Sequence, residues 1–150
     1  MGFGWYFVGG ILPITLKARD VMDKNVLFIE SDRIVSDAID MMVRNNVWSL
    51  VVLDKGVPVG VITERDIFRR VLGKGLKPES VKVKAAMTSP IITIEPDAPL
   101  GEAIRLMVEK EVRRIYVVED GKIVGRITEA DLFQNLLNVM LAIQSITYQF

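Results

Sequence analysis

Apolar side chains recur three and four residues apart in two segments of the chain, residues 35–46 and 100–111. This spacing places the apolar positions on one face of an α-helix, so each segment is predicted to form an amphipathic helix. The apolar positions of the first helix are Val35, Ala38, Ile39 and Met42. Those of the second helix are Leu100, Ala103, Ile104 and Met107.

Short apolar runs surround each predicted helix and indicate strands, since they are rich in β-branched residues. The predicted strands are 26–30, 49–54 and 58–63 around the first helix, and 91–95, 114–120 and 123–128 around the second. Gly56 and Gly121 lie in the tight turns between the last two strands of each set, where glycine readily adopts a positive φ. A closing helix is predicted to begin at Glu64 and again at Glu129.

The chain repeats itself with a constant offset. When residues 21–72 are placed over residues 86–137, 19 of the 52 pairs are identical. Unrelated sequences of ordinary composition would share about 3. One such unit buries too little apolar surface to fold alone, whereas two can pack their sheets against each other. The predicted fold is therefore α/β (α+β), with two pseudo-twofold-related β-α-β-β-α units packed sheet to sheet.

The repeat divides the chain into three predicted parts. Residues 1–16 form an apolar arm, 17–76 the first unit and 77–150 the second unit with its closing helix, and the polar segment 73–80 links the copies. The arm has no charged side chain, but it is shorter than the about 20 residues of a spanning helix and is interrupted by glycine and proline. We expect it to pack on the body or on a second chain, and its length disfavours a membrane anchor.

The amino-acid composition restricts the classes of function that this chain can have. The 150 residues include 19 basic and 19 acidic side chains, no histidine and no cysteine. The balanced charge disfavours a nucleic-acid binder that relies on bulk positive charge. The absence of cysteine excludes disulfides and thiol chemistry, and it fits a reducing compartment, so we expect a cytoplasmic protein.

Two related octapeptides lie where the last strand of each unit meets the closing helix: "GVITERDI" at 60–67 and "GRITEADL" at 125–132. On one interpretation, Thr63 and Asp66 cap a helix, and Thr128 and Asp131 repeat this cap. On the other, the same groups bind a ligand, because a helix N-terminus attracts phosphate and a carboxylate can accept hydrogen bonds from ribose hydroxyls. The two roles are compatible.

These octapeptides, the duplication and the order of elements together resemble a tandem of CBS domains, often called a Bateman module. The resemblance covers the chain from about Lys17 onward. It implies that AMP, ADP, ATP or S-adenosylmethionine binds in clefts between the copies. Asp66 and Asp131 would then hold ribose hydroxyls, while Thr63 and Thr128 would face phosphate or ribose.

The same resemblance extends the predicted nucleotide-binding set. Its apolar members, which would lie against the base or belong to the motif, are Val26, Ile62, Ile91 and Ile127. Arg113 and Arg114 stand where the family often carries a basic residue that pairs with phosphate, and a solvated strand edge is the alternative. The first copy has Trp48 and Ser49 there, so we expect unequal sites, with the second copy the better phosphate binder.

Trp48 itself is interpreted as packing in a core or a dimer contact in preference to base stacking. Arg65 and Arg126 lie beside the motifs and are secondary phosphate candidates.

The predicted protein is a regulatory module and not an enzyme, because no histidine, cysteine, glycine-rich phosphate loop or pair of catalytic carboxylates stands out. Its ligand is an adenine nucleotide, and no other cofactor is expected. The expected protein partners are a second copy, bound through the CBS helices, and an unknown regulated enzyme or transporter. One alternative is a structural dimerisation module without a working ligand site. Another is a single-stranded nucleic-acid binder, which zero net charge disfavours.

Overall fold

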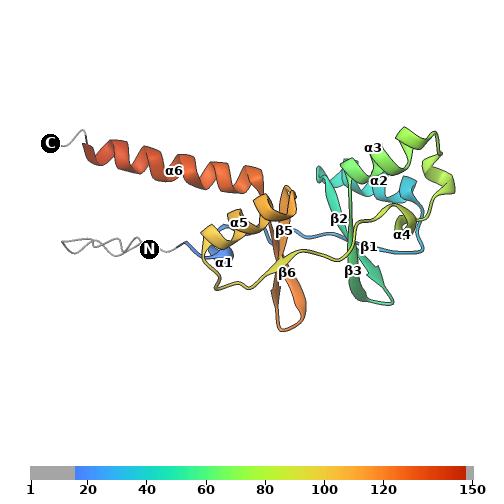
Figure 1. Ribbon diagram of the computed structural model, residues 1–150, viewed down its shortest axis with the longest axis horizontal. Coiled ribbons are helices and arrows are strands. Elements are labelled where there is room, and N and C mark those ends of the chain that lie inside the picture. The colour runs from blue at the N-terminus through green and yellow to red at the C-terminus, as the bar shows by residue number, and fades with distance from the viewer. Residues whose placement is uncertain (1–15, 148–150) are drawn as a thin grey trace.

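The structure, a computed structural model, describes residues 16–147 (Figure 1). The first copy contains α1 (Ala18–Val21), β1 (Phe28–Glu30), α2 (Val35–Asn45), β2 (Ser49–Asp54), β3 (Val57–Thr63) and α3 (Glu64–Arg70). Two short 3₁₀ turns, η1 (Leu72–Lys74) and η2 (Pro78–Ser80), form the link. The second copy contains α4 (Val83–Ala86), β4 (Thr93–Ile94), α5 (Leu100–Lys110), β5 (Arg114–Glu119), β6 (Lys122–Thr128) and α6 (Glu129–Thr147).

Each copy builds one three-stranded sheet with the same topology. β1 is parallel to β2 and β2 is antiparallel to β3, and β4, β5 and β6 repeat this arrangement. The register is also shared, because Ser49 lies opposite Thr63 just as Arg114 lies opposite Thr128. Gly56 and Gly121 have the expected positive φ, 79° and 75°. The predicted fold class is therefore confirmed, and the first strand of each copy is shorter than predicted.

The two sheets stand side by side with their helices on the outer faces (Figure 1). Between the sheets, Val51, Val61 and Tyr116 form a buried cluster, and Val26 and Ile91 pack against it. Each outer face carries its own hydrophobic core, where α2 covers the first sheet and α5 covers the second. We call the region between the two sheets the inter-unit boundary.

The short helix that opens each copy packs on the other copy. Ala18 and Val21 of α1 belong to the core of the second sheet, while Val83 and Ala86 of α4 belong to the core of the first. The predicted division at 17–76 and 77–150 thus describes the order of the chain, and the packed bodies exchange their opening helices. This exchange ties the units together, because neither core is complete without a segment from the other copy.

The ends of the chain differ from the compact centre. The predicted arm, residues 1–16, lies outside the described residues except for Leu16. α6 runs outward past α5, well beyond the sheets (Figure 1), and carries no charged side chain after Asp131. Between residues 16 and 147, no helix combines the length and the apolar character that a membrane span requires.

Candidate functional site

The first motif forms the predicted helix cap. Thr63 is the N-cap of α3, and its Oγ1 accepts a hydrogen bond from the Asp66 backbone N–H at 3.2 Å. The Thr63 backbone N–H and its hydroxyl both donate to Asp66 Oδ2, each at 3.0 Å. This reciprocal arrangement satisfies N–H groups that a helix start otherwise leaves without partners.

The second motif repeats the cap at the start of α6. The Thr128 backbone N–H and hydroxyl donate to Asp131 Oδ2 at 2.8 Å each, and the Asp131 backbone N–H donates to Thr128 Oγ1 at 3.3 Å. The capping interpretation is therefore confirmed in both copies. The ligand interpretation stays a prediction, and the cap leaves Oδ1 of each aspartate for other partners.

The glycine of each motif allows the opening segment of the other copy to approach β3 or β6. A Cβ atom on Gly60 would lie 2.8 Å from both Met87 Sδ and the Thr88 carbonyl oxygen. A Cβ atom on Gly125 would lie 2.6 Å from Met22 Sδ. These distances are shorter than van der Waals contact, so any side chain at either position would push the opening segment away. Each motif is thus in direct contact with the other copy.

Arg114 crosses the inter-unit boundary. Its guanidinium donates to the Trp48 carbonyl oxygen at 2.7 Å and pairs with Glu64 Oε1 at 3.1 Å. Glu64 is the first residue of α3, so this positive charge lies beside the first motif although its strand belongs to the second copy. Arg113 is exposed, and its carbonyl oxygen accepts a hydrogen bond from the Glu129 N–H. The two predicted arginines are therefore not brought together.

The facing sheets present different side chains at equivalent positions. Tyr116 and Arg126 are opposite each other on β5 and β6, where the first copy has Val51 and Val61. The Tyr116 hydroxyl donates to Ser49 Oγ at 3.0 Å across the boundary, and burial raises the pKa of this phenol.

The Arg126 guanidinium pairs with Asp23 Oδ2 at 3.2 Å, while its Nε is buried and has no hydrogen-bond partner in the described part of the chain. Such orphaned buried donors are rare, and one calls for an explanation.

The apolar members of the predicted set divide into two groups. Val26 and Ile91 lie at the inter-unit boundary, as the ligand interpretation requires. Ile62 and Ile127 are fully buried in the two outer cores, where they face the helices, so the structure does not bring them to the boundary. Sequence reasoning did not identify Thr88, Asp23 or Tyr116. The offset of 65 would have paired Thr88 with Asp23, but no local pattern connects either of them to a motif.

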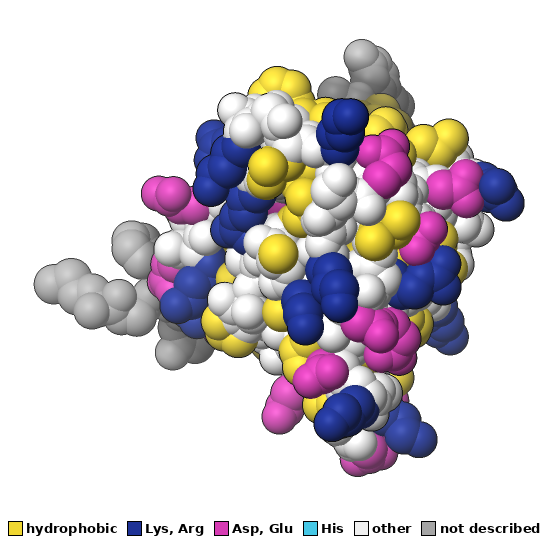
Figure 2. Space-filling view, turned by 90° about the vertical axis from the view of Figure 1, so that its right-hand side faces the viewer, with side chains coloured by type: hydrophobic (Ala, Val, Ile, Leu, Met, Phe, Trp, Pro, Cys, Tyr) yellow, Lys and Arg dark blue, Asp and Glu magenta, His cyan; other side chains and the backbone are white. Residues whose placement is uncertain are grey.

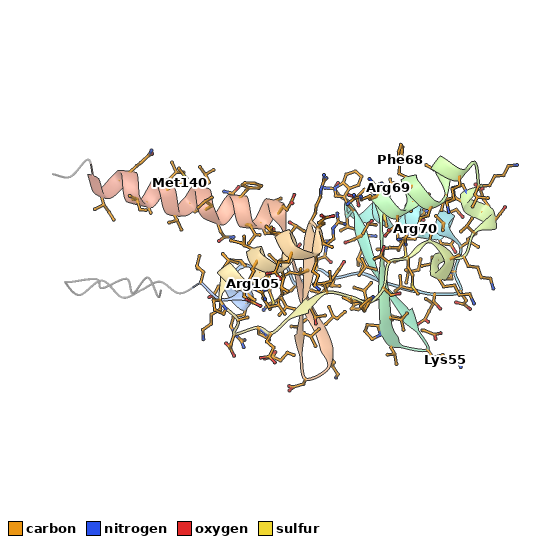
Figure 3. All side chains as sticks on the ribbon, in the orientation of Figure 1. Lys55, Phe68, Arg69, Arg70, Arg105 and Met140 are labelled. Carbon is orange, nitrogen blue, oxygen red and sulfur yellow. The ribbon has the colours of Figure 1, made fainter. Side chains whose placement is uncertain are left out.

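Two apolar grooves lie on the outer, helical side of the molecule, away from the facing sheets. One, of about 390 Å³, lies between α2 and α3 and is lined by Trp48 and Phe68; the other, of about 440 Å³, lies between α5 and α6 and is lined by Phe133. Trp48 is 63% exposed and therefore does not pack in a core. Figure 3 shows Phe68 on the outer side of α3 and Met140 on the outward-running part of α6. In residues 16–147, no group of acidic side chains is arranged to hold a metal ion.

A family model described as "CBS domain" matches residues 18–73 and 83–138. This chain belongs to the CBS-domain family. Proteins of this family are generally regulatory, and this chain carries two CBS domains in tandem.

Solved structures and curated relatives support the assignment. The crystal structure of an uncharacterized conserved protein from Pyrococcus horikoshii is 35% identical, covers 83% of this chain and 94% of that one, and has a TM-score of 0.76. A hexameric CBS-CP12 protein from bloom-forming cyanobacteria is 28% identical, covers 81% of this chain and 68% of that one, and has a TM-score of 0.75.

An uncharacterized protein of Methanopyrus kandleri is 39% identical over 95 residues, which is 62% of this chain and 48% of that protein. This CBS pair spans between 48% and 66% of the length of the first curated relatives that it matches.

Proposed function

We propose that this CBS pair is a non-catalytic regulatory module that binds an adenine nucleotide at the inter-unit boundary and signals to a partner protein. The second motif carries the proposal. Asp131 Oδ2 is used by the cap, and Oδ1 accepts no hydrogen bond from any residue between 16 and 147. A carboxylate oxygen in this state is a suitable acceptor for ribose hydroxyls.

Two further features support a phosphorylated ligand. α6 is 19 residues long, so its N-terminus carries a partial positive charge, while the Glu129 and Asp131 N–H groups already donate to the Arg113 carbonyl oxygen and to Thr128 Oγ1. Arg126 lies two residues before Thr128 on β6, and side chains two apart on a strand share a face. A cation and a helix N-terminus therefore flank the same motif.

Calorimetric titration of the protein with AMP, ADP, ATP and S-adenosylmethionine tests the proposal. We expect micromolar binding of at least one of them, since the site offers a few charge-assisted hydrogen bonds. If none of the four binds to a protein that is folded by circular dichroism, the nucleotide proposal is wrong. A regulated enzyme or transporter is the expected partner, and nucleotide-dependent co-purification would identify it.

A structural dimerisation module is the second candidate, because the two grooves favour self-association. Phe68 and Phe133 are each 70% exposed at equivalent positions in the two copies, and solvent-exposed aromatic grooves mark protein contacts. We propose that a second copy covers these grooves, whether or not nucleotide binds.

Sedimentation of Phe133→Glu tests this contact. We expect the variant to sediment at a lower mass than the wild type, while Lys77→Glu in the exposed link, the control, leaves the mass unchanged. Equal masses for the wild type and Phe133→Glu would exclude the grooves as the contact.

An extended polyanion is less well matched to this surface. On the face in Figure 2, Asp and Glu side chains lie beside and between the Lys and Arg side chains over most of the surface. Binding to single strands through a basic track therefore finds no support on that face.

A further inference from the structure

The two motif aspartates differ in how their second oxygen is used. Asp66 Oδ1 accepts a hydrogen bond from the Thr88 hydroxyl at 2.7 Å and lies 3.6 Å from the Arg70 guanidinium. With Oδ2 held in the cap, both oxygens of Asp66 are occupied, and its side chain is only 10% exposed. A ribose hydroxyl could reach this carboxylate only after Thr88 moved away.

The second copy lacks both of these partners. Asp23 stands at the position equivalent to Thr88, and Asn135 at the position equivalent to Arg70. An ionised aspartate cannot donate a hydrogen bond, and Asp23 is held by Arg126 instead. The Asn135 side chain donates to the Asp131 backbone carbonyl oxygen at 2.7 Å. Oδ1 of Asp131 is consequently left without a donor among residues 16–147.

The cations show the same asymmetry. Arg114, beside the first motif, is paired with Glu64 and the Trp48 carbonyl oxygen, so its charge is already neutralised. Arg126, beside the second motif, is paired with Asp23 Oδ2 at 3.2 Å, and its buried Nε has no acceptor. Phosphate would compete with Glu64 for Arg114 at the first motif and with Asp23 for Arg126 at the second, but only at the second would it also supply an acceptor to an orphaned donor.

We propose that nucleotide binds at the second motif through Asp131 and Arg126, and that Thr88 holds the first motif closed. This inference rests on the proposed function and adds the stoichiometry and the order of the two sites. The second copy is still expected to be the better phosphate binder. The physical cause, however, is Thr88 and Arg126 and no longer Arg113 and Arg114.

Calorimetry with AMP and ATP on four proteins tests the inference: the wild type, Asp131→Asn, Asp66→Asn and Thr88→Ala. Asparagine retains a capping oxygen and places an amide where the other oxygen was, so the two aspartate variants are matched. We expect one nucleotide per wild-type chain. Asp131→Asn should weaken binding by about tenfold or more, because it removes an acceptor of charge-assisted hydrogen bonds. Asp66→Asn should leave the affinity within about twofold.

Thr88→Ala distinguishes a closed site from an absent one. Alanine removes the hydroxyl donor and leaves space beside Asp66 Oδ1, so this oxygen should become available and a second, weaker binding event should appear. Two equal sites in the wild type, wild-type affinity in Asp131→Asn, or a single site in Thr88→Ala would each overturn the inference while the proposed function survives. No binding to any of the four proteins would overturn both. If Asp66→Asn does not fold, the other three proteins decide.

Discussion

Replacing Tyr116 by phenylalanine should weaken the contact between the two sheets. The Tyr116 hydroxyl on β5 donates to Ser49 Oγ on β2 at 3.0 Å, and the two residues are 2% and 3% exposed. Phenylalanine keeps the ring and removes the hydrogen bond, which leaves a buried serine oxygen without its partner. A buried group that loses its partner costs about 1–3 kcal/mol, so we expect a loss of about 1–2 kcal/mol in the free energy of unfolding.

The partner variant completes a double-mutant cycle. Ser49→Ala leaves the buried Tyr116 hydroxyl without an acceptor and should cost a similar amount, whereas the double variant removes both groups and should cost less than the sum of the two. Since the side chains are in contact, we expect a coupling energy of about 1 kcal/mol.

Urea unfolding followed by circular dichroism measures all three losses, and the matched control is Ser36→Ala, in α2, whose hydroxyl makes no hydrogen bond within residues 16–147. Additive losses, with a coupling energy near zero, would refute the argument that this bond joins the sheets.

Three further outcomes follow from the packing and the charges. Gly60→Ala should lower the free energy of unfolding by about 1–3 kcal/mol in urea, because its Cβ would meet a backbone oxygen of the other copy at 2.8 Å, whereas Gly101→Ala, in α5 with open space around it, should be neutral or stabilising.

A hydrogen bond from Arg19 lowers the pKa of Asp97, so this carboxylate stabilises the fold above about pH 4. The contribution is lost as the pH falls through the folded pKa of Asp97. In Asp97→Asn, the free energy of unfolding should therefore fall less steeply with decreasing pH in this acid range. Burial raises the pKa of Tyr116, so absorbance titration of the wild type should show a tyrosine that ionises at a higher pH than usual, and this step should be missing in Tyr116→Phe. The stability that the neutral phenol supplies should be lost as the pH rises above about 10.

The helices and the strand order could be predicted because their causes are local. Apolar spacing gave a helix at 35–46, and α2 spans Val35–Asn45. The exchange of α1 and α4 between the copies could not be predicted in this way. Ala18 and Ile115, which share the second core, are almost a hundred residues apart in the chain, and no periodic pattern within a short window carries such a contact.

The sequence predicted the cap residues of the site, but not which strand residues share a face with them. The threonine and aspartate of each motif make the predicted cap because capping depends on residues three apart. Ile62 and Ile127 belong to the predicted nucleotide-binding set as members of the motifs, but they lie in the outer cores. Neighbouring residues on a strand point to opposite faces, so it is Val61 and Arg126 that share a face with the threonines.

Among the buried positions, the two copies change from apolar to polar or charged residues where the sheets face each other. The outer cores repeat the same residue types, whereas the second copy places Tyr116 and Arg126 opposite each other where the first has Val51 and Val61. A buried guanidinium with an unsatisfied Nε costs stability compared with a valine at the same position. The ion pair with Asp23 offsets part of that cost, but it leaves Nε without an acceptor. A bound phosphate would supply this acceptor, so the asymmetry of the boundary supports the nucleotide proposal.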